Sequence, residues 1–177
     1  MLGTCKRTYF KRGENAMPKL KQDFTKVTEV QLVYHSKQKL EDRPVIKSSL
    51  DAYKLLFNTW DDGKLELQEQ FKIVLLDRKN SVLGVSTIAW GGISECAVDL
   101  RLAFATALKA RATGMILAHN HPSGNKTFSD SDKSLTRKFA EAGKVLDISI
   151  LDHIVLTRNT YSSMSDDGYM PTVQLKF

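Results

Sequence analysis

Residues 118–132, AHNHPSGNKTFSDSD, hold the side chains of this sequence that are best suited to chemistry. His119 and His121 end a short apolar run, and side chains two residues apart on a strand point the same way. A Pro-Ser-Gly turn follows, and Asp132 lies one turn into the next predicted helix. Two imidazoles and one carboxylate match the three protein ligands of a catalytic zinc, whose fourth ligand is a water with its pKa lowered to about 7. The stretch is therefore a candidate metal site that activates water.

The acid at the start of the helix has a second interpretation. Ser129-x-x-Asp132 is also a helix-capping pattern, with Asp in place of the usual Glu, and it would look the same with no metal nearby. The two interpretations are compatible, because Ser129 can cap the helix and face a metal at once. The sequence alone leaves both open.

The rest of the chain predicts one α/β domain, a mixed sheet with helices packed around it. Apolar runs and alternation predict strands at 28–36, 71–77, 82–90, 115–119, 148–157 and around the YSSM motif. Helical periodicity predicts helices at 48–60, with Ser48 or Ser49 as N-cap, at 98–112, closed by Gly114, and at 129–146, interrupted late by Gly143.

The motif HNHPSG followed by Ser129-x-x-Asp132 resembles the signature of the RadC-like JAB domain, a branch of the JAB/MPN (JAMM) metalloprotease superfamily. The resemblance covers about residues 67–168. It implies a JAB/MPN-type, cytidine-deaminase-like fold. It also implies one Zn²⁺ per chain held by His119, His121 and Asp132, with Ser129 helping to hold the substrate oxyanion or the water.

The superfamily also uses an upstream glutamate as general base and then acid. Glu69 stands just ahead of a predicted hydrophobic strand, where the family pattern places this residue, and Glu95 lies ahead of a predicted helix. We favour Glu69 and keep Glu95 as the alternative. Either residue could instead be an acid that faces solvent.

Three further residues match family positions. Arg101 matches an arginine at a helix start, although Leu100 precedes it where the family usually has proline. Asp152 and His153 match an Asp-His pair late in the sheet, for which we expect support of the ligands or packing rather than direct ligation.

Positive charge is concentrated at the N-terminus. The 177 residues carry a net charge of +6, and residues 1–26 hold seven Lys or Arg against two acids, so the remainder is nearly neutral. We expect a basic, poorly ordered extension at 1–27, a strand and helix at 28–66, the JAB/MPN domain at 67–170 and a tail at 171–177. Nucleic acid would be contacted only through the extension.

Other features favour a cytoplasmic protein with no membrane partner. No apolar run approaches the roughly 18 residues that cross a bilayer, and the N-terminus lacks the apolar core of a secretory signal. Cys5 and Cys96 do not indicate a disulfide framework, and we expect Cys96 to be a small buried residue rather than a catalytic thiol.

Two functions follow from these observations. The first is a zinc metallopeptidase or isopeptidase that uses zinc-activated water on an unknown peptide or protein substrate. The second is a non-catalytic module, associated with DNA repair or with protein interaction, whose metal site is structural or degenerate. We also expect the protein to lack the N-terminal helix-hairpin-helix segment of longer RadC relatives, which would weaken DNA binding.

Overall fold

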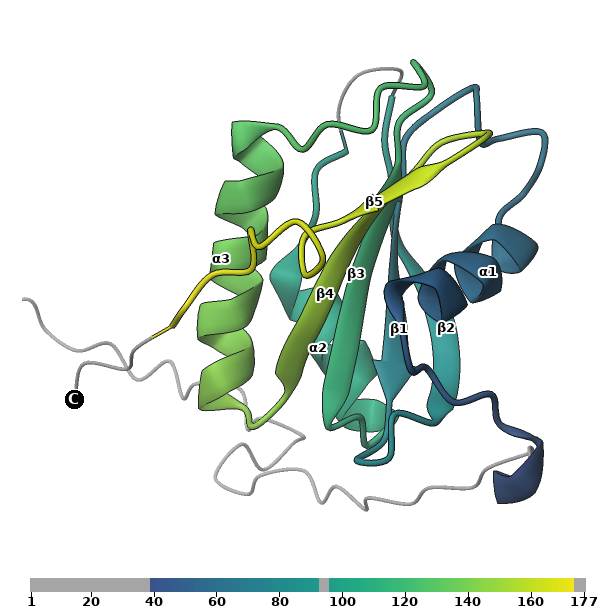
Figure 1. Ribbon diagram of the computed structural model, residues 1–177. Helices are drawn as coiled ribbons and strands as arrows, with labels where there is room; N and C mark the ends of the chain where they lie inside the picture. Colours follow the sequence, from purple (N-terminus) through teal and green to yellow (C-terminus); the bar gives the residue numbers. More distant parts are fainter. Residues whose placement is uncertain (1–38, 93–95, 174–177) are drawn as a thin grey trace, which may run out of the picture. The chain divides into compact units, whose positions relative to one another are not determined.

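The structure, a computed structural model, describes residues 39–92 and 96–173. The predicted extension at 1–27, the predicted strand at 28–36 and Glu95 lie outside these residues. The described part is a mixed α/β domain with a five-stranded sheet flanked by helices (Figure 1). Its elements are a short 3-10 helix (Leu40–Asp42), α1 (Ser49–Thr59), β1 (Gln70–Leu76), β2 (Val82–Trp90), α2 (Leu100–Lys109), β3 (Gly114–Asn120), α3 (Asp130–Val145), β4 (Ser149–Leu156) and β5 (Tyr161–Ser163).

The sheet has the strand order β2-β1-β3-β4-β5. β1 forms an antiparallel hairpin with β2 and also runs antiparallel to β3, where Phe71 faces His119. β3 and β4 are parallel and are joined through α3, while β4 and β5 are antiparallel. β3 therefore lies at the centre of the sheet, and all of its residues are buried.

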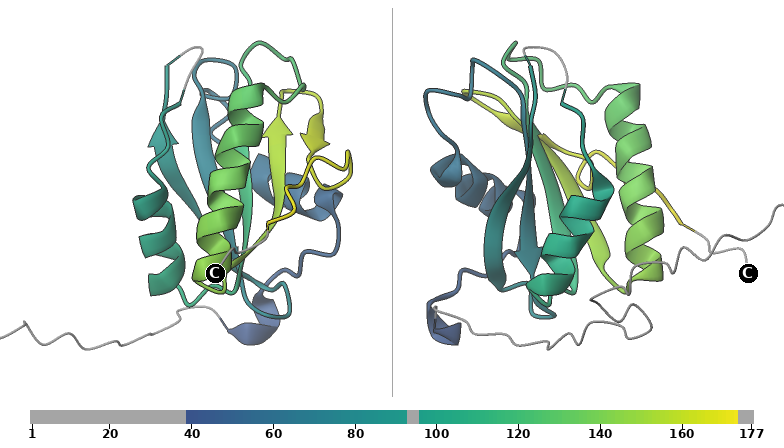
Figure 2. Two further views of the ribbon diagram at one scale, coloured as in Figure 1. Left: turned by 90° about the vertical axis from the view of Figure 1, so that its left-hand side faces the viewer. Right: turned by 180° about the vertical axis from the view of Figure 1, so that it is seen from behind.

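Helices cover both faces of the sheet. The right-hand view of Figure 2 shows α1 on one side and α2 with α3 on the other. Side chains alternate between these two layers along each strand, so Ile116 and Ala118 pack toward α1 while Met115 and Leu117 pack toward α2 and α3. This alternation continues to the end of β3 and decides which residues face the candidate site.

The first and third helices begin where the sequence predicts. Ser48 caps α1, since its side chain accepts from the backbone N–H of Asp51, and Ser129 caps α3. The predicted interruption of α3 at Gly143 is wrong, because the helix continues to Val145. A Cβ at position 143 would lie 2.4 Å from the carbonyl oxygen of Ile148, so glycine permits a close approach to the chain leading into β4.

The second helix is shorter than predicted. It is capped by Asp99 and ends at Lys109, and the left-handed residue that follows is Arg111, with φ of 59°. The prediction that Gly114 closes this helix is wrong, since Gly114 is the first residue of β3. The chain turns earlier than expected because Ala112 already packs in the core beneath α2.

Within residues 39–92 and 96–173, no helix combines the length and the apolar character that crossing a membrane requires.

Candidate metal centre

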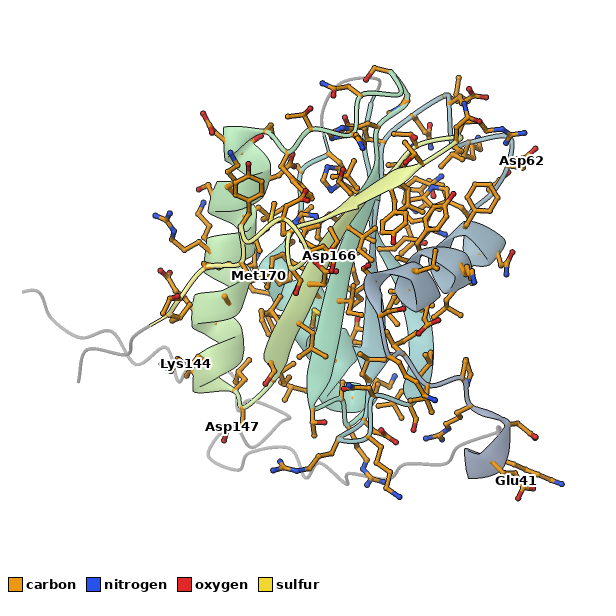
Figure 3. The ribbon with its side chains drawn as sticks, viewed as in Figure 1. Glu41, Asp62, Lys144, Asp147, Asp166 and Met170 are labelled. Carbon is orange, nitrogen blue, oxygen red and sulfur yellow. The ribbon has the colours of Figure 1, made fainter. Side chains whose placement is uncertain are left out.

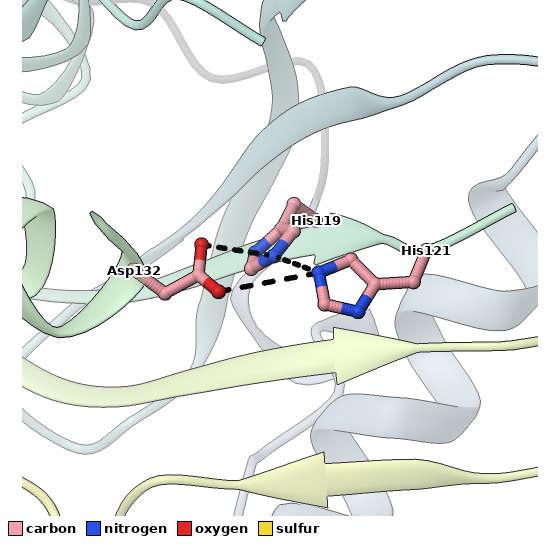
Figure 4. Close-up of side chains that lie close together, drawn as sticks. All are labelled: His119, His121 and Asp132. Atoms are coloured by element: carbon pink, nitrogen blue, oxygen red, sulfur yellow. Dashed lines mark hydrogen bonds and ion pairs between the residues drawn. The ribbon is translucent and has the colours of Figure 1, made fainter. Parts of the chain in front are cut away.

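The end of β3 and the start of α3 bring His119, His121 and Asp132 together (Figure 4). One potential ligand atom from each residue lies within 4.8 Å of the others. The two Nε2 atoms are 2.9 Å apart, and Asp132 Oδ1 lies 3.2 Å from His119 Nε2. Asp132 Oδ2 lies 4.0 Å from His121 Nε2. Three side chains from two elements therefore converge on one point.

Asp132 has two roles in this arrangement. Its Oδ2 accepts from the backbone N–H of Ser129 at 2.8 Å, while its own backbone N–H donates to Ser129 Oγ at 3.1 Å, which completes a capping box. Its Oδ1 faces His119. The helix cap and the carboxylate of the cluster are thus the same side chain, as the sequence allowed.

The tautomer of His119 follows from a chain of hydrogen bonds. The Thr136 hydroxyl donates to the carbonyl oxygen of Asp132 at 2.6 Å, so it must accept from His153 Nδ1–H at 2.7 Å. His153 Nε2 then carries a lone pair and accepts from His119 Nδ1–H at 2.8 Å. His119 Nε2 is left with a lone pair that points at the cluster.

A local contact orients the ring of His121. Its Nδ1 lies 2.5 Å from the carbonyl oxygen of Asn125, which can only accept, so Nδ1 carries the proton. The two Nε2 atoms lie 2.9 Å apart beside a carboxylate, a spacing that requires a proton or a cation among them. This nitrogen and oxygen donor set is one that Zn²⁺ accepts.

Burial favours the neutral forms of His119 and His153. It lowers the pKa of His119 to about 4 from the ordinary 6.5, with the Asp132 charge opposing this shift and His121 adding to it. Burial also holds the pKa of His153 well below its usual value, and the neighbouring His119 and His121 act in the same direction. A neutral imidazole is the form that binds a metal.

The cluster opens into a cavity of about 520 Å³. Glu69 lines this cavity together with His119, His121 and Asp132, whereas Glu95 lies outside the described residues. Glu69 directly precedes β1 and shares the parity of Phe71 and Ile73, which pack on the face covered by α2 and α3. The structure therefore places Glu69 on the side of the sheet that carries the two histidines. A second cavity of about 510 Å³ is also lined by Glu69, His121 and Ser129.

Cys96 lines the first cavity as well. It is half-buried, and its pKa is raised first by burial and then by the charge of Glu69. Both effects favour the neutral thiol, which is a poor nucleophile. This environment suits the small packing residue that the sequence indicates.

The structure does not bring the other two predicted residues to the cluster. Arg101 is exposed at the start of α2 and pairs with Asp99 at 2.7 Å. Asp152 accepts from Ser163 Oγ at 2.7 Å and from the backbone of Ser165 at 2.9 Å, so its carboxylate holds the chain around β5. Burial raises the pKa of Asp152, against the lowering effect of these hydrogen bonds.

Sequence reasoning did not single out Thr136, Asn125 or Asn120, which all contact the segments that form the site. Thr136 lies four residues after Asp132, so helical spacing could have placed it on the same face. Asn125 contributes its backbone carbonyl, for which side-chain identity carries no signal. Asn120 is fully buried, and a polar residue inside a buried strand indicates a partner that the sequence does not name.

The sheet order and the His-His-Asp cluster together define an α/β domain with a candidate metal centre at the end of its central strand. The sequence matches the model of the RadC-like JAB domain over residues 46–169, which include α1. The chain therefore belongs to the RadC-like JAB domain family.

Relatives named UPF0758 protein share this domain. The chain is 41% identical over 123 residues to one from Flavobacterium johnsoniae, covering 70% of this chain and 52% of that protein. It is 36% identical over 128 residues to one from Desulfitobacterium hafniense, covering 72% of this chain and 55% of that protein. One from Thermotoga maritima is 37% identical over 101 residues, or 57% of this chain and 46% of that protein. The chain thus spans about half the length of these curated relatives.

Proposed function

We propose that this protein is a zinc-dependent hydrolase that cleaves a peptide or isopeptide bond, with one Zn²⁺ held by His119, His121 and Asp132. The observation that carries the proposal is the convergence of two imidazole Nε2 atoms and a carboxylate at the wall of an open cavity. A structural zinc site usually has four protein ligands, whereas three ligands leave a position for water or substrate. Membership of the RadC-like JAB family supports the same assignment.

The metal and the surrounding side chains would each have a separate catalytic role. Zinc bound here would polarise a carbonyl and lower the pKa of a coordinated water to about 7. Glu69, in the same cavity, would take a proton from the attacking water and return it to the leaving amine. Ser129 lies at the cavity wall, and its hydroxyl, which donates to Asp132 Oδ2 in the structure, would turn to donate to the substrate oxygen once substrate is bound.

Replacement of Glu69 tests this division of roles. We expect Glu69→Gln to keep about one zinc per chain and to lower hydrolysis by about 100-fold or more, because the proton acceptor is gone while the three ligands remain. The assay uses zinc-loaded full-length protein with a proteome-derived peptide mixture and a set of lysine isopeptides, and new termini are counted by mass spectrometry. Glu141→Gln, an exposed glutamate on α3, is the matched control and should cleave like the wild type.

The other possible results of this assay distinguish between the alternatives. Full activity in Glu69→Gln would exclude Glu69 as the base, and the same assay on Glu95→Gln would then test the alternative glutamate. Zinc-loaded wild type that cleaves nothing would favour a non-catalytic module over the proposed hydrolase.

A further inference from the structure

Asn120 lies between the two histidines of the candidate centre but points to the opposite face of the sheet. It ends β3, is fully buried, and has the parity of Ala118, which packs toward α1. Its side chain accepts from the backbone N–H of Gln70 at 2.8 Å. It also donates to the carbonyl oxygens of Leu65 at 2.7 Å and of Gln68 at 2.9 Å. Both amide protons of Asn120 are therefore donated to backbone carbonyls of residues 65–70.

This segment carries Glu69. Gln68 and Gln70 are its two neighbours in the chain, and Asn120 binds the backbone of both. The backbone of Glu69 itself is paired with the end of the hairpin, through Gly92 O at 2.9 Å and Gly91 N at 2.8 Å. One face of the segment is thus held to the histidine strand, and Glu69 lies in the cavity on the other face.

The beginning of the same loop is held by different contacts. Lys72 Nζ donates to the carbonyl oxygen of Thr59 at 2.9 Å, and Arg158 pairs with Asp62, which Figure 3 labels beyond the end of α1. These contacts lie before residue 65. The part that leads directly to Glu69 is therefore the part that Asn120 holds.

We propose that Asn120 is a positioning residue that keeps Glu69 in register with His119 and His121. Its position on β3 links the two sides of the centre, because the same three residues 119–121 carry both ligands and the contact to the Glu69 segment. The inference rests on the proposed function in that it gives Glu69 a role beside the metal.

The chemistry of this position is specific to asparagine. One acceptor and two donors are needed at once, which a side-chain amide of this length supplies. An aspartate would place a carboxylate oxygen against two carbonyl oxygens, and an alanine would remove this partner from two buried backbone groups and one partly buried one.

A double-mutant cycle on zinc affinity tests the proposal without a substrate. The dissociation constant of full-length protein for Zn²⁺ is measured by competition with a chromogenic chelator. Glu69→Gln should weaken zinc binding about fivefold in the wild-type background, because it removes a negative charge close to the cation. In the Asn120→Ala background the same substitution should change the affinity by less than about twofold, since Gln68 and Gln70 on either side of Glu69 are no longer held to the histidine strand.

Two variants guard against a purely structural explanation. Asn120→Asp keeps the size and the acceptor, so it serves if Asn120→Ala does not fold, and the same loss of coupling is expected. Asn58→Ala, at an exposed position of α1, is the matched control and should leave the fivefold effect intact. A general loss of stability would not selectively remove the coupling to Glu69.

The outcomes separate this inference from the proposed function. If zinc binds and Glu69→Gln has the same effect in all backgrounds, or no effect in any, the positioning role of Asn120 is wrong while the metal site stands. If the wild type binds no zinc, the proposed function fails, and amide exchange decides the role of Asn120. Asn120→Ala should then speed exchange of the Gln70 amide, which loses its acceptor, and unchanged exchange would overturn the inference.

Discussion

A short chain of hydrogen bonds, from Thr136 through His153 to His119, decides which nitrogen of His119 offers its lone pair to the cluster. His119 is neutral because of burial, so its tautomer rather than its charge controls whether it can bind a metal. Thr136 sets the direction of these hydrogen bonds, since its hydroxyl proton is donated to the carbonyl oxygen of Asp132. A hydroxyl on α3 thus acts on a candidate metal ligand that it does not touch.

Removal of that hydroxyl should weaken zinc binding. Thr136→Val has nearly the same shape but cannot accept from His153, so we expect the zinc affinity to fall about tenfold. Thr136→Ser keeps the hydroxyl and should bind like the wild type. Chelator competition measures both constants, with thermal unfolding to show that each variant is folded. Equal affinity in Val and Ser variants would mean that the hydrogen-bond chain does not set the tautomer.

Some of these residues could be predicted and others could not, for a physical reason. His119, His121 and Asp132 lie within one short stretch, where strand and helix periodicity relate their directions. Asn120 binds residues 50 and 55 positions away, and His153 meets Thr136 across 17 positions, so these contacts depend on strand register and helix docking. Local sequence patterns carry no information on strand register or on helix docking.

Among the helices and strands, the N-terminus of α3 has the closest connection to the site. Ser129 caps the helix and also donates to Asp132 Oδ2 at 2.7 Å, so one side chain serves helix stability and carboxylate position. Ser48 caps α1 with the same kind of contact but lies away from the cluster. The two serines form a natural comparison.

Loss of the two caps should have separable effects. We expect Ser129→Ala and Ser48→Ala each to lower the free energy of unfolding by about 1 kcal/mol, measured by urea denaturation of the metal-free protein. Only Ser129→Ala should also weaken zinc binding, by up to about tenfold, because Asp132 Oδ2 loses the hydroxyl, one of the two donors of Ser129 that orient it. A similar loss of zinc affinity in both variants would show that general stability, and not the position of Asp132, governs binding.

The predicted elements agree with the structure where a signal is local. The β1–β2 hairpin, the strand before HNHP and the caps of α1 and α3 all follow from alternation and capping residues. The end of α2 and the continuity of α3 through Gly143 do not, because they depend on how the connecting chain packs against the sheet. In the sequence Gly143 suggests an interruption of the helix, but in the structure it permits the close approach of α3 to the backbone of Ile148.

For the molecule as a whole, the buried imidazoles link folding stability to pH. His119 has a native pKa near 4 and an ordinary value of 6.5, so between these pH values the unfolded chain binds a proton that the native state does not. The contribution of His119 to the free energy of unfolding is therefore fully present above about pH 6.5 and declines as the pH falls toward 4. His153 acts with the same sign, and Asp152, whose pKa burial raises, acts with the opposite sign.

Urea denaturation of EDTA-treated protein at several pH values between 7.5 and 4.5 measures this linkage. The free energy of unfolding should fall toward low pH, with His119 contributing up to about 3 kcal/mol. His119→Gln should fall less steeply, because it lacks this group while Asp152 is unchanged. Parallel curves for the two proteins would contradict the assignment of a neutral, buried His119.

The central claim is that His119, His121 and Asp132 bind a metal ion. Elemental analysis of purified full-length protein, dialysed after loading with zinc, tests it most directly. We expect about one zinc per chain in the wild type and none retained by His119→Ala/His121→Ala, which removes two of the three ligands. Wild type without zinc, or a double variant that retains as much as the wild type, would contradict the proposed metal centre.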